Sequence, residues 1–214
     1  TFKIGGPARL FLSPENVETA AAVLRKAHQL ELSVRFIGKG SDLLVSDHGI
    51  SQVVLAFNPD SACMRLEEER IICQSGASLT AVCVFAQKQG LTGLEFAYGI
   101  PGSLGGAIFM NAGAYGGEMK DVLEWVEYLD EEGQLHHLEK EKLELSYRRS
   151  FFTSHPKFLI TAACLQLSKG DKAEILEKMR DLKARRIAKQ PLDYPSAGST
   201  FKRPEGNYAS ALID

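Results

Sequence analysis

The amino-acid sequence predicts an α+β protein made of two subdomains followed by the start of a third. Residues 9–57 show the order strand, helix, strand, loop, strand, which is typical of a small α/β unit. From Ala62 onward the pattern changes to short β-rich runs joined by charged turns, as in antiparallel hairpins. We therefore expect the subdomains to cover residues 1–60, 61–168 and 169–214.

The first subdomain is defined by alternating strand and helix signals. Residues 9–12 read as a strand, and Ser13 and Pro14 are expected to be the N-cap and first residue of a helix. A single apolar stripe follows at helical spacing, formed by Val17, Ala20, Ala21, Leu24, Ala27 and His28. Residues 34–37 then read as a buried strand, and residues 52–57 read as another strand.

The second subdomain is expected to contain two hairpins and one amphipathic helix. The hairpins pair residues 64–66 with 70–74 and residues 122–129 with 135–138. The helix covers residues 78–89 and ends at Gly90, a usual position for glycine after a helix.

The third part begins after a further β-rich run at residues 158–167. A charged helix is expected over residues 172–188, ended by Pro191 and Pro195. Its inward residues are expected to be Ile175, Leu176, Met179, Leu182 and Ile187.

Composition limits the possible functions. The chain has 214 residues, 44% hydrophobic and 24% charged, with a formal net charge of −2 and no long basic run, so we expect neither a nucleic-acid partner nor a membrane partner. No signal peptide is recognisable at the start. Four widely spaced cysteines, without C-x-x-C spacing, are expected to be small buried residues of a reduced, cytoplasmic protein. Both chain ends read as abrupt, and we expect a fragment.

The glycine-rich run of residues 99–117 holds seven of the nineteen glycines together with apolar anchors. A packed glycine-rich segment lets backbone amides approach a ligand closely, most often a phosphate. Within it, residues 107–111 are expected to form a short helix whose N-terminal amides meet an anion. The alternative is that these glycines only permit close packing of a helix on a sheet.

A second glycine loop, residues 38–42, follows a predicted strand. It matches neither the Walker A motif nor the dinucleotide fingerprint. Taken alone, it is equally well explained as a tight turn. Two such loops together favour a pyrophosphate cofactor.

Two polar clusters complete the candidate site. Tyr147 and Arg148 open the run Tyr-Arg-Arg-Ser, where an arginine beside aromatic residues can present its guanidinium to a carboxylate or a phosphate. The alternative is a solvated charged surface. Residues 195–204 contain Ser199, which lies in no nucleophile elbow and, taken alone, reads as a turn serine. His136 and His137 are expected to be exposed strand residues and not metal ligands.

Taken together, these motifs resemble one family over essentially the whole chain, the UDP-N-acetylenolpyruvoylglucosamine reductases (MurB). The matching segments are residues 1–8, 38–46, 99–117, 147–150 and 195–202, in the family's order and approximate spacing. The short distance from Tyr147 to Ser199 is similar to the family's type II form. The resemblance implies a two-subdomain FAD-binding fold of the vanillyl-alcohol-oxidase/MurB (PCMH-like) type, followed by the start of a substrate-binding α+β domain.

The resemblance also implies that the two glycine loops hold the pyrophosphate of FAD. The implied cofactor-binding residues are Gly38, Lys39, Gly40, Ser41, Asp42, Leu43, Pro101, Gly102, Ser103, Gly105, Gly106, Asn111 and Gly113. The family pattern usually has Asn where this chain has Asp42, and commonly Gly where it has Lys39.

The implied reaction is the NADPH-dependent reduction of UDP-N-acetylglucosamine enolpyruvate to UDP-N-acetylmuramate, a step of peptidoglycan precursor synthesis. Arg148 would stabilise the enolate-like charge on the substrate carboxylate, and Ser199 would donate the proton. Lys202 would assist Ser199, and both Tyr147 and Lys202 would border the substrate. A third catalytic group, a glutamate, is expected beyond residue 214. We expect a monomer.

Two other functions remain open at this point. The chain could be an FAD-binding remnant without reductase activity, because the expected C-terminal catalytic segment is absent from the sequence. A different oxidase on the same flavin scaffold is the third possibility, which the Tyr147 and Ser199 motifs disfavour.

Overall fold

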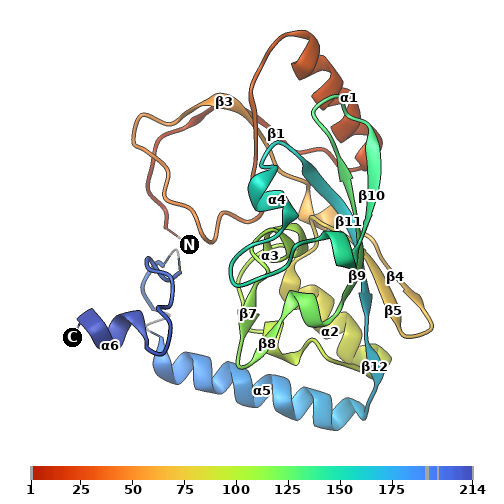
Figure 1. Cartoon of the computed structure of the whole chain (residues 1–214), viewed down its shortest axis with the longest axis vertical. Coiled ribbons are helices and arrows are strands. Elements are labelled where there is room, and N and C mark those ends of the chain that lie inside the picture. Colours follow the sequence, from red (N-terminus) through yellow and green to blue (C-terminus); the bar gives the residue numbers. More distant parts are fainter. Residues whose placement is uncertain (1, 191–192, 197, 214) are drawn as a thin grey trace.

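The computed structural model describes residues 2–190, 193–196 and 198–213. Its elements fall into a small parallel sheet with one helix, a larger antiparallel sheet with three helices, and a long helix below them (Figure 1). The parallel sheet and α1 fall within residues 1–60, and the antiparallel sheet falls within residues 61–168. This agreement leaves the division into three subdomains a prediction, because the boundaries themselves remain untested.

The first sheet has the strand order β1-β3-β2, and all its pairs are parallel. Its strands are β1 (Ala8–Leu12), β2 (Val34–Phe36) and β3 (Ile50–Leu55). Helix α1 (Val17–Gln29) crosses from β1 to β2 and buries Ala20, Ala21, Leu24 and Ala27, as the apolar stripe predicts. His28, which was expected in the stripe, is exposed.

The start of α1 was predicted wrongly. The N-cap is Asn16 and not Ser13, because the Asn16 carboxamide accepts a hydrogen bond from the Thr19 amide over 2.8 Å. Pro14 lies before the helix, and its carbonyl oxygen accepts a hydrogen bond from the Asn58 amide. Asparagine is as strong an N-cap as serine, so the sequence offered two starts and the contact with residue 58 favours the later one.

The second sheet has the strand order β10-β9-β11-β5-β4, and all its pairs are antiparallel. Its strands are β4 (Met64–Glu67), β5 (Arg70–Gln74), β9 (Leu123–Leu129), β10 (Leu135–Glu139) and β11 (Leu159–Gln166). Both predicted hairpins are present. The β-rich run is the central strand β11, which is buried along seven of its eight residues.

One face of this sheet packs on the main core. Helix α2 (Leu79–Gln89) ends at Gly90, which has a φ of +71° as the predicted C-terminal glycine requires. Helix α3 (Leu104–Phe109) and the short helix α4 (Phe151–Ser154) lie against the same core. A smaller cluster joins α1 and Leu55 of β3 to the large sheet through Leu129 and Leu159.

Helix α5 (Lys172–Lys189) runs along the lower edge of the molecule in Figure 1, below α2 and the short strands. These strands are β6 (Leu91–Thr92), β7 (Gly113–Ala114), β8 (Gly117–Glu118) and β12 (Ser168–Lys169). Ile175 and Met179 are buried as predicted, but Ile187 is 53% exposed. Ile187 lies in the last turns of α5, beyond the part that packs on α2.

Pro191, which was expected to end α5, lies outside the described residues. Helix α6 (Ala209–Ile213) lies near the C-terminus (Figure 1). Within the described residues, no helix is both long enough and apolar enough to cross a membrane.

Candidate functional site

The first glycine loop, residues 38–42, follows β2 at the edge of the small sheet. Gly40 has a φ of +63°, and a Cβ added there would meet nothing within 4 Å. Among the described residues, the amides from Gly38 to Asp42 have no hydrogen-bond acceptor. Open space in front of unpaired amides suits an anionic group such as a phosphate.

The two glycine loops touch each other directly. The Ser41 hydroxyl donates to the Pro101 carbonyl oxygen over 2.8 Å. A Cβ on Gly38 would lie 2.2 Å from the Ser103 Oγ, so only glycine leaves room for that hydroxyl. The predicted pairing of the loops is therefore a contact in the structure.

The predicted short helix is three residues earlier than expected, and its first amides are already used. Leu104 donates to the Ala77 carbonyl and Gly105 to the Ser75 carbonyl, both over 2.9 Å. The Gly106 amide donates to the N-cap hydroxyl of Ser103. The expectation that amides of this helix meet an anion is therefore wrong for these three residues.

The glycines of α3 instead permit close packing, which was the alternative explanation. A Cβ on Gly105 would lie 2.9 Å from the Ser75 Cβ. In the described part of the chain, the amides of Gly102 and Ser103 have no acceptor. They are therefore the amides of the glycine-rich run, beside Ser41, that are available to bind a ligand. We call the amides of residues 38–42, 102 and 103 the amide cradle.

Asn111 lies in a different environment from the other predicted cofactor residues. It is fully buried with a φ of +41°, and its carboxamide is bonded within the protein. Nδ2 donates to Glu118 and to the Ser146 carbonyl, and Oδ1 accepts from the Lys120 amide. Its side chain therefore connects the glycine-rich run to the turn that carries Arg148.

Arg148 is held in this turn by three hydrogen bonds to residues 109–113. The first is the bond from Asn111 to the Ser146 carbonyl. In the second, the Arg148 guanidinium donates to the Gly113 carbonyl over 3.3 Å. In the third, the Ser150 hydroxyl donates to the Phe109 carbonyl. The φ of Arg148 is +53°, which is uncommon for a residue with a side chain. Its guanidinium carbon lies 5.0 Å from the centre of the Tyr147 ring.

The segment of residues 195–204 lies against both the first glycine loop and this turn. A Cβ on Gly198 would lie 3.0 Å from Oδ1 of Asp42, so this carboxylate packs against the backbone beside Ser199. At the other end, the Arg203 amide donates to the Tyr147 hydroxyl over 3.1 Å. Ser199 and Lys202 are exposed between these two contacts.

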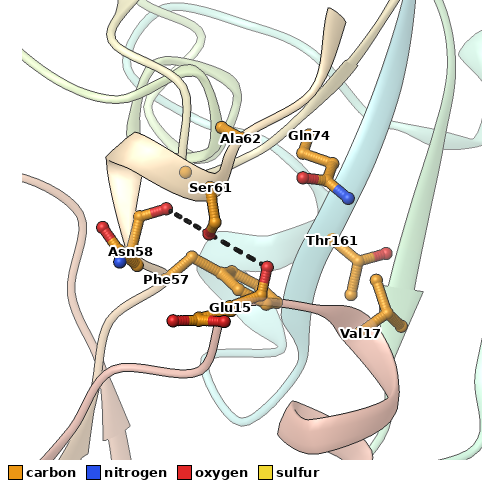
Figure 2. A pocket seen from close by; sticks show the side chains of 9 residues that line it. Glu15, Val17, Phe57, Asn58, Ser61, Ala62, Gln74 and Thr161 are labelled. Atoms are coloured by element: carbon orange, nitrogen blue, oxygen red, sulfur yellow. Dashed lines mark hydrogen bonds between the residues drawn. The ribbon is translucent and has the colours of Figure 1, made fainter.

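A narrow pocket lies where the two sheets meet (Figure 2). Its lining residues are Glu15, Val17, Phe57, Asn58, Ser61, Ala62, Gln74, Gly76 and Thr161. Thr161 is 1% exposed, and within the described residues its hydroxyl is the buried side-chain group that lacks a hydrogen-bond partner. Gly76 of this pocket adjoins Ser75, the residue that packs against Gly105.

A second cavity, of about 190 Å³, lies between α5 and the strands β7 and β8. Glu95, 3% exposed, forms part of its wall together with Phe96, Tyr115 and Lys178. Burial alone would raise the pKa of Glu95, but hydrogen bonds from the Thr92 hydroxyl and the Gly93 amide, with the charge of Lys178, hold the pKa below its ordinary value.

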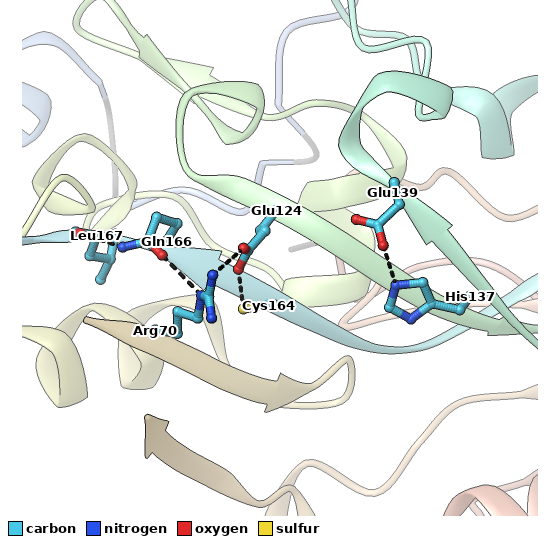
Figure 3. A network of polar contacts seen from close by, with 7 residues as sticks. All are labelled: Arg70, Glu124, His137, Glu139, Cys164, Gln166 and Leu167. Atoms are coloured by element: carbon cyan, nitrogen blue, oxygen red, sulfur yellow. Dashed lines mark hydrogen bonds and ion pairs between the residues drawn. The ribbon is translucent and has the colours of Figure 1, made fainter. Parts of the chain in front are cut away.

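The outer face of the large sheet carries a polar network (Figure 3). Arg70 binds Glu124 and Gln166, Cys164 donates to Glu124, and His137 pairs with Glu139. His136 pairs with Asp130 over 2.6 Å. The described residues include no group of three potential metal ligands, and both histidines have carboxylate partners. The network stabilises the sheet surface, away from the cradle.

Cys73, Cys83 and Cys164 are buried as predicted, but Cys63 is exposed. Cys63 lies in an irregular segment directly before β4. In such a segment, apolar neighbours in the sequence do not predict that a side chain is buried. Burial raises the pKa of each of the other three thiols to about 12.

Comparison with known proteins agrees with this geometry. Residues 8–139 match a family model described as an FAD binding domain. The chain is 48% identical to the UDP-N-acetylenolpyruvoylglucosamine reductase of Lachnoclostridium phytofermentans and 45% identical to that of Clostridium novyi. These alignments cover 100% of this chain, and 70% and 69% of the two relatives. The chain belongs to the UDP-N-acetylenolpyruvoylglucosamine reductase family.

A solved structure supports the same assignment. The crystal structure of the reductase from Thermus caldophilus superposes with a TM-score of 0.80 at 33% identity, covering 98% of this chain and 73% of that one. The family match and this superposition confirm the predicted α+β, FAD-binding fold class.

Sequence reasoning missed two contacts at the site. Gly198 was not singled out, although its φ of +89° and its place beside Asp42 make it a contact residue. Ser75 was not singled out at all. The adjoining Gly76 lies close to Phe57 instead, and only the fold shows that Gly105 is the partner of Ser75.

Proposed function

We propose that this chain carries an FAD-dependent reductase site that converts UDP-N-acetylglucosamine enolpyruvate to UDP-N-acetylmuramate with NADPH as reductant. One observation carries the proposal. Three segments far apart in the sequence meet: the amide cradle, the Tyr147–Arg148 turn and the segment that holds Ser199. Family membership supports the identity of the substrates.

The residues present fit FAD at the cradle. The amides of residues 38–42, 102 and 103 would hold its pyrophosphate, because they lie where the two loops touch and have no acceptor among the residues that the structure describes. Lys39 adds a positive charge to that loop. The Asp42 carboxylate, in the same loop, packs toward Gly198. Gly105, Gly106 and Asn111 would act through packing and hydrogen bonds within the protein.

The chemistry then divides between binding and proton transfer. FAD bound there would supply hydride transfer from NADPH to the enolpyruvyl methylene carbon. The Arg148 guanidinium, fixed by Gly113 and stacked beside Tyr147, would stabilise the negative charge that develops on the substrate carboxylate. An arginine suits this role because its donors match a carboxylate in a bidentate geometry.

Ser199 would donate the proton to the carbon next to the carboxylate. A serine hydroxyl is a weak acid, so it needs a neighbouring group that stabilises its charged form. Lys202 lies three residues further on in the same exposed segment and is proposed as that group. Tyr147 and Lys202 would border the substrate.

We further propose that the chain works as a monomer in the cytoplasm. The cysteines of the described residues are all free, which is typical of a reducing compartment.

The function is tested by anaerobic spectroscopy on the purified chain. We expect flavin absorbance that bleaches with NADPH and returns when the enolpyruvyl UDP-sugar is added. A yellow protein that the sugar cannot reoxidise would support the FAD-binding remnant instead. A colourless protein that takes up no added FAD would contradict both.

The role of Ser199 has its own test. Ser199→Ala should leave bleaching by NADPH unchanged and slow the return of absorbance by about a hundredfold or more. Ser33→Ala, at an exposed serine before β2, is the control. Equal loss in both half-reactions would refute the assignment of Ser199 as proton donor.

A further inference from the structure

We propose that Tyr147 is a positioning residue whose hydroxyl fastens the Ser199 segment to the Arg148 turn. This inference rests on the proposed function for the roles of Ser199 and Arg148. It assigns the Tyr147 hydroxyl a task inside the protein, in addition to any contact of the ring with substrate.

The hydroxyl and the ring of Tyr147 have separate partners. The hydroxyl oxygen accepts a hydrogen bond from the Arg203 backbone amide over 3.1 Å, across 56 positions of the chain. The ring lies 5.0 Å from the guanidinium carbon of Arg148. One side chain therefore contacts both the charge-stabilising arginine and the segment that carries the proton donor.

The attachment has a defined place in that segment. Gly198 packs against Asp42 at one end, and Arg203 binds Tyr147 at the other. Ser199 and Lys202 lie between these two attachments. Both of their side chains are exposed, so the backbone contacts at residues 198 and 203 are what places them. Loss of the hydrogen bond to Tyr147 would give the end of this segment that contains Lys202 more freedom to move.

The change Tyr147→Phe isolates the hydroxyl, because the ring beside Arg148 remains. The first measurement is limited tryptic digestion of the FAD-loaded chain, followed by mass spectrometry. Trypsin cuts after Lys202, and the peptide nitrogen of that bond is the Arg203 nitrogen that donates to Tyr147. We expect cleavage there to become about threefold to tenfold faster, because cleavage of a fast-opening segment follows its open population.

Two controls separate local opening from general instability. Cleavage after Lys142, in the exposed turn that follows β10, should be unchanged in the variant. Tyr194→Phe, which removes a hydroxyl from another exposed tyrosine, should leave both cleavage rates as they are. Unchanged cleavage after Lys202 in Tyr147→Phe would overturn the proposal, and so would an equal increase at Lys142.

The second measurement concerns the reaction. In Tyr147→Phe, flavin reduction by NADPH should stay within twofold of the parent rate. Reoxidation by a saturating concentration of the UDP-sugar should slow about tenfold, whereas a lost substrate contact alone would raise KM and leave the saturated rate intact. An unchanged saturated rate would overturn the positioning role. If the parent chain does not reduce the sugar, the proposed function fails, while the digestion result still decides the attachment.

Discussion

The hydroxyl of Ser41 donates a hydrogen bond to the carbonyl oxygen of Pro101 over 2.8 Å, and this bond joins the two glycine loops. Ser41→Ala should therefore weaken FAD binding without unfolding the protein. A hydrogen bond of this kind contributes about 1 kcal/mol, or about a fivefold change in dissociation constant. Titration of the apoprotein with FAD, followed by flavin fluorescence, measures the change. Ser33→Ala, an exposed serine before β2, should leave the affinity as it is.

Substitutions at Gly38 and Ser103 should have strongly non-additive effects on the free energy of unfolding. A Cβ at residue 38 would displace the Ser103 hydroxyl, which caps α3 through the Gly106 amide. Gly38→Ala and Ser103→Ala should each lower the free energy of unfolding by about 1 kcal/mol. The double variant should lose no more than either single one, because both changes break the same cap. Urea unfolding of the four proteins gives the comparison, and strictly additive losses would contradict it.

Asn111 is expected to be a structural residue of the site. Asn111→Ala removes three hydrogen bonds of a fully buried side chain and leaves the Lys120 amide and the Ser146 carbonyl without that partner. The free energy of unfolding should fall by about 3 kcal/mol. Urea denaturation monitored by circular dichroism measures it. A loss below about 1 kcal/mol would show that water replaces the carboxamide.

Glu95 should make stability depend on pH in the acid range. Its folded-state pKa lies below the ordinary value of 4.5, so its contribution is present above that value and is lost as the pH falls through the folded pKa. Glu95→Gln should be less stable at pH 7 by about 1–3 kcal/mol. Its stability should also change less than that of the parent protein as the pH falls. Thermal unfolding from pH 7 to pH 3 tests this. Glu177→Gln, exposed on α5, should keep the parent's slope.

The thiols should differ sharply in reactivity. Only Cys63 is exposed, whereas burial raises the pKa of Cys73, Cys83 and Cys164 to about 12. A thiolate is the reactive form, so one equivalent of a chromogenic disulfide reagent should be consumed rapidly at pH 8. The other three thiols should react only after denaturation. Cys63→Ser should abolish the rapid phase, and a rapid phase that survives this change would contradict the assignment.

The sequence predicted the elements well where one physical signal dominated. Gly90 and the turn at residues 130–133 mark their boundaries unambiguously, and both are found as expected. The errors lie where two signals compete. Ser13 and Asn16 are both good N-caps, and only the contact between Pro14 and Asn58 distinguishes them. Ile187 continues the apolar spacing of α5 but is exposed. The spacing predicts which face of a helix is apolar, but it does not predict how far along the helix that face is covered by other elements.

At the candidate site, the sequence indicated which segments carry the chemistry but not how their polar groups are used. The pairing of the glycine loops was predicted and is present in the structure. The α3 amides were expected to be available, yet Ser75, Ala77 and Ser103 accept their hydrogen bonds. Ser75 and Ala77 lie about thirty residues earlier in the chain than the α3 residues that they bind, so no local pattern indicates them as partners.

The strand order of the large sheet also constrains how the protein folds. Strand β11 lies between β9 and β5, and between β5 and β11 the chain makes a long excursion that includes the glycine-rich run and the Arg148 turn. The central pairing of the sheet therefore closes a loop of more than eighty residues, which is slow because the entropy of loop closure precedes the gain in contacts. The cofactor loop and the arginine turn are enclosed by that step, so they should acquire their final geometry together with the core.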